Sequence, residues 1–465
     1  MPTRTPIVRP RRTRDALAHT VSAETWRRAF VVRPADATLA VSVRVGLAAT
    51  LVLVVFGLTG HGDVAGLAVL SALTSAFARH DPLRRTAEKV GSVGILVVSS
   101  VLVGGLIALA GLPVWAQIAS IAVLSGAAAA VLAAFRIAGP GPVILVFAAT
   151  AAVGSTASAA DLAVALVSST VGATVGLGVA LVPLLFLPWG PARLAVARAL
   201  AAAAAVPAGA DPAAARDAIT SAREKLVLTA TSTGHTNASD LAAILGEADA
   251  ALDEWELGDP RRLDEVVRHE AELRKAKRHR TILGAGTGAP PLPRPPSFVA
   301  VGVAGLRTRA VTEYAARIVV ASAVAGWLAA ELGFDHPLWA SMGAMAAMQG
   351  VTYGQTVQRA IQRLLGNVGG AVIAAALIAL SLGYWQCVVI IAVLQVAAEV
   401  TATRNYALCS LFVTPMALLV IGLGATVDTG TAVSRVVDTL VGVVVGVIVA
   451  AVTISRADRA HLAGR

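Results

Sequence analysis

Two arginines and two glycines fall on one face of an apolar segment in the second half of the chain. Arg359, Arg363 and Gly366 are spaced i, i+4 and i+7, and Gly369 follows three residues later, so a helix places them along one side. A guanidinium binds a carboxylate through two parallel hydrogen bonds, and glycines let a neighbouring helix approach closely. The pattern predicts an organic-anion site beside a helix-packing interface. The alternative is that both arginines only anchor the helix at the lipid headgroups.

A second polar pattern opens the last apolar segment. Arg435 and Asp438 are spaced i, i+3, and Gly442 and Gly446 follow on the same segment. Ionisable residues inside a membrane span indicate a functional site by default. Arg435 is therefore a second candidate for binding the anion, and Asp438 is a candidate proton carrier. The two glycines are candidate packing positions. A structural ion pair between Arg435 and Asp438 is an equally good interpretation.

Three further residues stand near the ends of apolar segments. Glu399 is the best-placed carboxylate for a proton relay, with an ion pair to Arg404 at the helix end as the rival interpretation. Arg317 is a further candidate anion ligand, or an anchor that reaches the headgroups. Trp339 is predicted to anchor its segment at the membrane interface.

Motifs for enzyme and cofactor chemistry are absent from the sequence, which has no Walker A, HExxH, CxxC or GxSxG pattern. We therefore expect no enzyme activity, no metal site and no cofactor, and ATP is not expected to drive the protein directly.

The composition indicates a membrane protein. Of 465 residues, 56% are hydrophobic and 14% charged, and the mean hydropathy is +0.74, whereas soluble proteins carry about 25% charged residues. Uncharged runs of about 20 residues span a bilayer as helices, and the alternating polarity of a β-barrel is missing. The sequence predicts an all-α polytopic membrane protein.

The apolar runs predict about 12 transmembrane helices in two groups of six. The predicted spans are 40–59, 63–79, 90–111, 114–135, 141–158, 162–188, 315–333, 337–352, 366–383, 385–402, 405–425 and 434–455. The second span of each group is short, so it can be tilted, broken or re-entrant. The predicted regions are a basic tail (1–39), a first bundle (40–190), a cytoplasmic region (191–312), a second bundle (313–455) and a C-terminal tail (456–465).

The two groups of spans repeat each other. Four pairs of identical residues are separated by 275 positions: His61 and His336, Arg84 and Arg359, Gly91 and Gly366, Gly94 and Gly369. Gly172 and Gly176 recur as Gly442 and Gly446 at a spacing of 270. The halves are not equivalent, because Glu88 stands where the repeat would place Arg363. A duplicated membrane half is typical of transporters whose site lies between the halves.

The loop charges predict the orientation. Lys and Arg gather in the N-terminal tail, in alternate loops and in the C-terminal tail, and these residues mark the cytoplasmic side. We therefore expect a multi-pass protein of the cytoplasmic (inner) membrane with both termini inside. An even number of spans per half makes the repeats parallel.

The net charge of +10 is accounted for by these flanks, and nucleic-acid binding is not expected because no basic patch with interleaved aromatic residues occurs.

The polar region between the halves is predicted to form helices. Asp211-Pro212 and Asp259-Pro260 each combine an N-cap with proline at the first helical position. Helices are expected near 212–232, 238–256 and 260–281, followed by a stiff proline-rich stretch at 289–297. The charged helix 260–281 is either a solvated face or a docking surface.

In order and spacing, motifs of the second half resemble the FUSC-like family of integral membrane transporters, the fusaric-acid-resistance-like proteins and aromatic acid exporters. The resemblance runs from Arg317 to Ala451 and is weak in the first half. The motifs that carry it are His336-Pro-Leu-Trp339, the Arg359/Arg363/Gly366/Gly369 helix, Asn405-Tyr406, Thr414 and Arg435-x2-Asp438-Thr439-x2-Gly442. The resemblance implies two six-span bundles, cytoplasmic helices, and export of organic anions along an arginine-lined route. Arg359, Arg363 and Arg435 match that route, with Arg317 as a further candidate.

These observations together predict an inner-membrane secondary transporter. It would export aromatic or other organic carboxylates along an arginine-lined route between the two repeats, with Glu399 or Asp438 as the proton carrier. A passive organic-anion channel and a non-transporting scaffold in envelope assembly are the alternatives. The expected partners are a small organic anion and the lipid bilayer, and the oligomeric state is left open.

Overall fold

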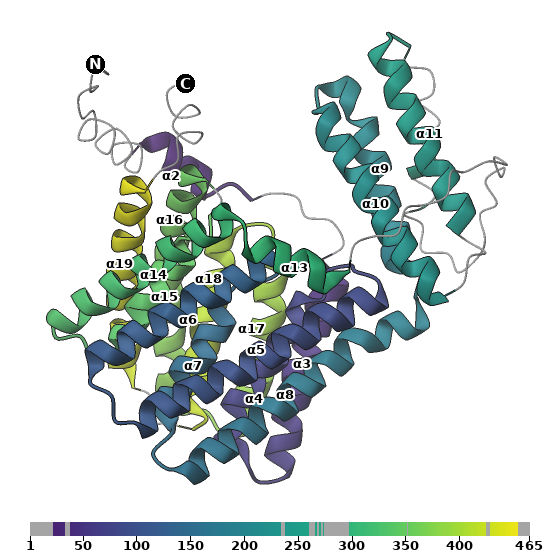
Figure 1. Ribbon diagram of the computed structural model, residues 1–465. Helices are drawn as coiled ribbons and strands as arrows, with labels where there is room; N and C mark the ends of the chain where they lie inside the picture. Colours follow the sequence, from purple (N-terminus) through teal and green to yellow (C-terminus); the bar gives the residue numbers. More distant parts are fainter. Residues whose placement is uncertain are drawn as a thin grey trace, which may run out of the picture. The chain divides into compact units, whose positions relative to one another are not determined.

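The computed structural model describes most of the chain, and every regular element in the described part is helical (Figure 1). The described residues are 22–32, 38–233, 238–259, 266, 269–270, 273, 297–350, 352–424 and 428–453. An all-α fold is therefore confirmed for them. Most of the predicted helix 260–281 and the proline-rich stretch before Ser297 lie outside the described residues.

The first half contains six helical segments in the predicted order. They are α3 (Leu39–Leu58), the segment Gly62–Phe77, α5 (Leu83–Leu109), α6 (Val114–Ala134), α7 (Val143–Ser155) and α8 (Ala159–Phe186). Residues Gly62–Phe77 are broken into η1 (Gly62–Val64), α4 (Ala65–Ala72) and η2 (Leu73–Phe77). A short helix, α2 (Ala23–Ala29), precedes them.

The second half repeats this order. After α13 (Phe298–Leu306) come α14 (Arg309–Glu331), α15 (Pro337–Ala347), α16 (Tyr353–Ala379), α17 (Tyr384–Ala402), α18 (Tyr406–Gly422) and α19 (Thr429–Val452). α16 begins at Tyr353, whereas the predicted span begins at 366, because the first turns of this helix are polar. Those turns carry Arg359 and Arg363.

Eight of the described helices are long and apolar enough to cross a membrane: α3, α5, α6, α8, α14, α16, α17 and α19. The other predicted spans are shorter: α7 has 13 residues, α15 has 11 and α18 has 17, and Gly62–Phe77 is interrupted. At 1.5 Å per residue these helices are shorter than a hydrocarbon core of about 30 Å. The protein is a polytopic α-helical membrane protein, and the count of 12 spans stays a prediction.

The two halves pack against each other through reciprocal helix pairs. α3 packs on α17 and α14 packs on α6, while α4 contacts α18 and α15 contacts α7. In the first pair, a Cβ on Gly46 of α3 would lie 2.5 Å from Val396 Cγ2 of α17. In the second pair, a Cβ on Gly126 of α6 would meet Val319 Cγ2 of α14. The first helix of the half supplies the glycine in the interface of α3 with α17, but it supplies the valine in the interface of α14 with α6.

The last helix of each half packs closely on the second helix of the same half. A Cβ on Gly172 of α8 would overlap the backbone oxygen of Ala68, and a Cβ on Gly442 of α19 would overlap that of Ala340. Backbone cannot move aside as a flexible side chain can, so only glycine fits at these crossings.

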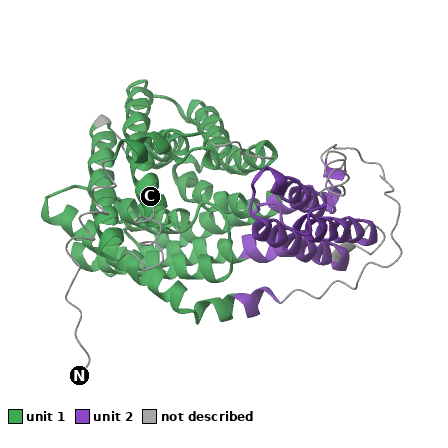
Figure 2. Ribbon diagram, turned by 90° about the horizontal axis from the view of Figure 1, so that it is seen from above, with its two compact units in different colours: residues 1–77, 92–179, 302–465 green, residues 78–91, 180–301 purple. Residues whose placement is uncertain are grey.

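The chain divides into two compact units (Figure 2). One contains residues 1–77, 92–179 and 302–465, and the other contains 78–91 and 180–301. The second unit is built on α9 (Gly190–Ala204), α10 (Pro212–Thr233) and α11 (Ala238–Glu256). The helices predicted at 212–232 and 238–256 are therefore confirmed. Their shared core includes Leu200, Leu226, Leu245 and Leu252.

Candidate functional site

Arg359 and Arg363 of α16 both contact Tyr406, the first residue of α18. The guanidinium carbon of Arg359 lies 4.1 Å from the centre of the Tyr406 ring. Arg363 Nη1 donates to the Tyr406 hydroxyl at 3.1 Å, and Arg359 Nη2 donates to Gln349 Oε1 at 3.2 Å. The two arginines that share a helix face thus meet around one aromatic ring.

The starts of the two helices set this arrangement. The Thr352 side chain caps α16, and the Asn405 side chain caps α18 by accepting from the backbone N–H groups of Ala407 and Leu408. Such caps satisfy N–H groups that the first helical turn leaves unpaired. Because Asn405 is the cap, Tyr406 is the first helical residue and stands beside the arginines.

Gly366 and Gly369 lie where α16 crosses α18, as predicted for packing positions. A Cβ on Gly366 would overlap the backbone oxygen of Ala407, and one on Gly369 would lie 2.7 Å from Leu411 Cδ1. The close crossing brings the first turn of α18 against α16, and with it the Tyr406 ring. Gly446 contributes in the same way between α19 and α15, where a Cβ would lie 3.2 Å from the backbone oxygen of Ala344.

The charges of Arg359 and Arg363 are not compensated locally. Neither side chain forms an ion pair with a carboxylate among the residues that the structure describes, and the Nε atoms of both are buried without a hydrogen-bond partner. Arg363 is only 6% exposed. A buried charge without a partner is costly, so these Nε edges are suited to receive a carboxylate.

Arg435 of α19 is buried beside two aromatic rings. Its guanidinium carbon lies 4.8 Å from the centre of the Trp339 ring and 5.8 Å from that of Phe147. Trp339 also stacks on His336, with ring centres 4.2 Å apart. The expectation that Trp339 anchors the interface is therefore wrong, because the ring is buried against Arg435. Cation–π contacts of this kind stabilise a desolvated guanidinium.

The ion pair that was the alternative interpretation of Arg435 and Asp438 is not formed. Asp438 is 1% exposed, and both of its carboxylate oxygens are buried without a hydrogen-bond partner. Arg435 is close enough to be attracted by Asp438 and repelled by Arg363. Sequence spacing allowed the pair, but in the fold Arg435 turns toward the aromatic rings.

A layer of neutral hydrogen bonds ties the helices together beside these charges. Asn367 Nδ2 of α16 donates to Thr439 Oγ1 of α19 at 2.6 Å. Thr414 Oγ1 of α18 donates to Asn367 Oδ1 at 2.6 Å. All three side chains are buried. The layer fixes α16, α18 and α19 relative to one another, one residue along α19 from Asp438.

The arginines lie at successive depths in the second bundle. The end of α19 lies at the Arg359 end of the bundle, because Arg317 Nε donates to Thr453 Oγ1 at 2.9 Å and Tyr314 is close to both Arg317 and Arg359. At 1.5 Å per residue, Arg359 and Arg363 lie about 9 and 15 Å along α16, and Arg435 lies about 26 Å from the matching end of α19.

The site belongs chiefly to the second half. Its polar side chains come from the second half, and the first half supplies the Phe147 ring from α7. The structure brings Arg317 to the same end as Arg359. Glu399 is buried on α17, which packs on α3 and α18. Sequence reasoning did not assign Tyr406, Gln349 or Phe147 a role at the site.

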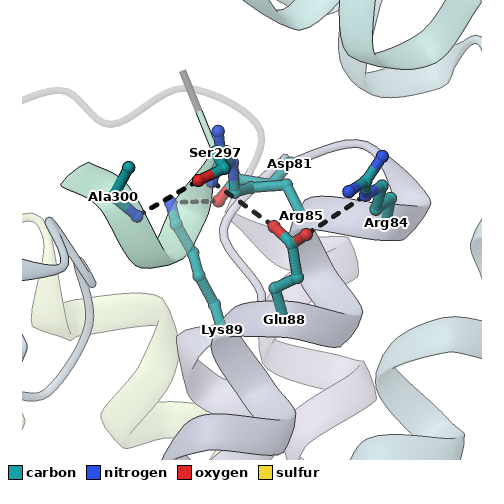
Figure 3. Close-up of polar contacts among 7 residues, drawn as sticks. All are labelled: Asp81, Arg84, Arg85, Glu88, Lys89, Ser297 and Ala300. Atoms are coloured by element: carbon teal, nitrogen blue, oxygen red, sulfur yellow. Dashed lines mark hydrogen bonds and ion pairs between the residues drawn. The ribbon is translucent and has the colours of Figure 1, made fainter. Parts of the chain in front are cut away.

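The corresponding part of the first half has its charges paired. Glu88, at the position equivalent to Arg363, accepts from Arg84 Nε at 3.1 Å and from Arg85 Nη1 at 3.4 Å (Figure 3). Lys89 Nζ donates to Asp81 Oδ2 at 2.7 Å. Two acidic residues thus contact three basic ones at the start of α5, and Asp81 also lies 3.7 Å from Lys225 Nζ. The start of α16 has no such acidic partners in the described residues.

Metal chemistry has no visible ligand set, since no group of three or more His, Cys, Asp or Glu side chains that could hold a metal ion occurs in the part of the chain that the structure describes.

Comparison with known proteins places the site in a family context. The chain is 38% identical over 96 residues to the "Uncharacterized membrane protein YvaC" of Bacillus subtilis (strain 168), a match that covers 21% of this chain and only 15% of that protein. No solved structure matches. Residues 320–449 match the family described as "Fusaric acid resistance protein-like". The resemblance to this family is thus confirmed over residues 320–449, which contain Arg359, Arg363, Tyr406, Arg435 and Asp438.

Proposed function

We propose that this protein is a secondary transporter that exports organic carboxylates, aromatic ones included, from the cytoplasm across an inner membrane. The observation that carries the proposal is the row formed by Arg359, Arg363 and Arg435. These guanidinium groups lie at successive depths, and none forms an ion pair with a carboxylate among the described residues. Guanidinium groups in a low-dielectric setting attract and hold anions strongly.

In this proposal the substrate carboxylate binds first at the cytoplasmic end. The free Nε edges of Arg359 and Arg363 receive it while their other nitrogens stay bonded to Gln349 and Tyr406. The carboxylate then passes the layer of Asn367 to Arg435. The Trp339 and Phe147 rings beside Arg435 offer an apolar wall to the organic part of the substrate.

Asp438 is the candidate proton carrier. An ionised carboxylate that is buried without hydrogen bonds is costly, and its attraction to Arg435 is its visible electrostatic support in the site. A substrate carboxylate on Arg435 would weaken that support and favour protonation of Asp438. Substrate binding and proton binding would thereby be linked. Glu399, which is buried on α17, is the second candidate.

The reciprocal interfaces support a rocking motion of the two halves. Repeated bundles that pack through small residues can move as bodies around a site near their interface. The exchanged Gly46–Val396 and Val319–Gly126 contacts favour a pseudo-twofold arrangement of the two halves.

Uptake into proteoliposomes tests the arginine row. Labelled benzoate uptake is measured for the wild type and for Arg359→Gln/Arg363→Gln, with Arg84→Gln/Arg85→Gln as the matched control at the corresponding end of α5. Charged hydrogen bonds are worth about 1.5–3 kcal/mol each, so the first variant should raise the half-saturating concentration about tenfold or more. The control should behave as the wild type. Equal losses in both variants would refute a route confined to the second bundle.

A pH gradient separates the transporter from a passive organic-anion channel. Coupled export predicts that an imposed proton gradient drives benzoate accumulation against its own gradient. A channel would instead give a current that reverses at the Nernst potential of the anion whatever the pH difference. A panel of carboxylates with neither flux nor current would leave only the scaffold interpretation.

A further inference from the structure

The segment before the first span is bound to the Arg359 end of the second bundle. Residues 22–32 include α2, which packs on α16 (Figure 1). Gln358 Nε2 donates to the backbone oxygen of Arg28 at 3.1 Å, and Gln362 Nε2 donates to that of Ala29 at 2.9 Å. These contacts join parts of the chain more than 300 residues apart.

Asn405 completes the attachment from α18. Its Nδ2 donates to the backbone oxygens of Ala29 at 2.9 Å and Val31 at 3.2 Å. The last turn of any helix leaves carbonyl groups without intrahelical partners. Here three side-chain amides of the second bundle donate to the carbonyl oxygens of Arg28, Ala29 and Val31, at and just beyond the end of α2. Gln362 and Asn405 are only 5% and 6% exposed, so the contact is specific rather than a loose surface encounter.

The contact adjoins the proposed anion entrance. Gln358 and Gln362 precede Arg359 and Arg363 by one residue each, and Asn405 precedes Tyr406. Every one of these side chains presents hydrogen-bond donors to the same end of the bundle. The carbonyl oxygens of residues 28, 29 and 31 occupy some of those donors, as an anionic ligand would.

The attachment depends little on apolar burial. Within α2, only Thr25 and Ala29 are buried, while Trp26 and the following Phe30 are exposed. Four hydrogen bonds to neutral amides therefore supply most of the specific hold. A contact of this strength can open and close, because each such bond contributes a factor of about five to the docked population.

We propose that residues 22–32 are a latch that closes the cytoplasmic entrance formed by Arg359, Arg363 and Tyr406. The latch is docked in the structure described, and its release exposes the entrance. The identity of what then enters rests on the proposed function, but the closing of this end does not. The latch adds an autoinhibitory contact to the transport route.

Alkylation of Cys409 reports on the entrance. Its half-buried side chain lies one turn along α18 from Asn405 and close to Tyr406. In a Cys387→Ser background, inside-out vesicles are treated with a membrane-impermeant maleimide. A truncation lacking residues 1–32 should be labelled at least tenfold faster than one lacking residues 1–21, which keeps the latch. Equal rates would overturn the proposal.

Point variants test the latch in the full-length chain. Asn405→Asp keeps the cap of α18, since Asp is as good an N-cap as Asn, but loses both donated bonds. Gln362→Met keeps the side-chain length and loses one bond, so labelling should rise about fivefold. Gln117→Met is the matched control, because Gln117 Nε2 donates to the backbone oxygen of Leu112 at 2.8 Å outside the latch. A rise in the control equal to that of Gln362→Met would also overturn the latch.

Benzoate uptake by the same truncations separates the two proposals. Faster uptake without residues 1–32 supports both. Faster labelling of Cys409 with no uptake by any variant supports the latch and counts against carboxylate transport. Uptake by both truncations at one rate, together with unchanged labelling, supports transport and refutes the latch.

Discussion

The reciprocal interfaces predict that a glycine and a valine can be exchanged between α3 and α17. In Gly46→Val the new Cβ would lie 2.5 Å from Val396 Cγ2, and such overpacking should destabilise the protein by about 1–3 kcal/mol. Val396→Gly alone leaves a gap and should cost a similar amount. The double variant reproduces the arrangement of Val319 and Gly126 in the other interface. It should recover most of the loss, as a coupling energy of about 0.5–3 kcal/mol.

Heat stability of the purified protein measures this coupling. The fraction that still elutes at its native position in detergent is followed after heating, for each single variant and for the double variant. Gly46→Val/Val389→Gly is the matched control, because Val389 is on the same helix but 64% exposed. If the Val396 double variant is no more stable than this control, the contact between α3 and α17 is not the one described.

Three further outcomes follow from the described contacts. Gly442→Ala should prevent stable folding, because its Cβ would overlap the backbone of α15. Gly178→Ala, where a Cβ would have nothing within 4 Å, should be neutral. The yield of folded protein after solubilisation compares the two variants. Asp438→Asn removes the carboxylate that attracts Arg435, so benzoate should bind more tightly while uptake loses its response to a pH gradient in proteoliposomes. Hydrogen bonds from Thr431 lower the pKa of Asp428, so this cap stabilises α19 above the unfolded carboxyl value of about 3.9. The stabilisation is lost as pH falls through the folded pKa, so hydrogen exchange at the start of α19 should become faster in acid. Asp428→Asn should abolish this acid-dependent rise.

The sequence predicted the helices wherever an apolar run defined them. The span predicted at 385–402 is Tyr384–Ala402, and that predicted at 114–135 is Val114–Ala134, because about 20 apolar residues both form and delimit such a helix. The prediction failed at the start of α16, which begins at Tyr353 rather than at 366. Hydropathy detects only the membrane-buried part, while this helix continues through polar turns.

The candidate site was predictable in its residues but not in its partners. Helical spacing placed Arg359 and Arg363 on one face, which the shared contact with Tyr406 bears out. Spacing could not show that Arg435 turns to Trp339 instead of Asp438, because that choice depends on rings supplied by other helices. The attachment of α2 was also hidden, since it rests on backbone oxygens that any sequence provides.

The two halves differ in charge where they agree in packing, and in the proposed transporter this difference would direct an anion to the second half. Packing positions such as Gly172 and Gly442 face backbone in both halves, so both halves need glycine there. The starts of α5 and α16 are not under that constraint. At α5, Glu88 lies at contact distance from two neighbouring arginines and offsets part of their charge. At α16, Arg359 and Arg363 have no such partner among the described residues, so in the proposed transporter their charge would attract the approaching anion. A duplicated fold can in this way keep two structural halves and one anion route.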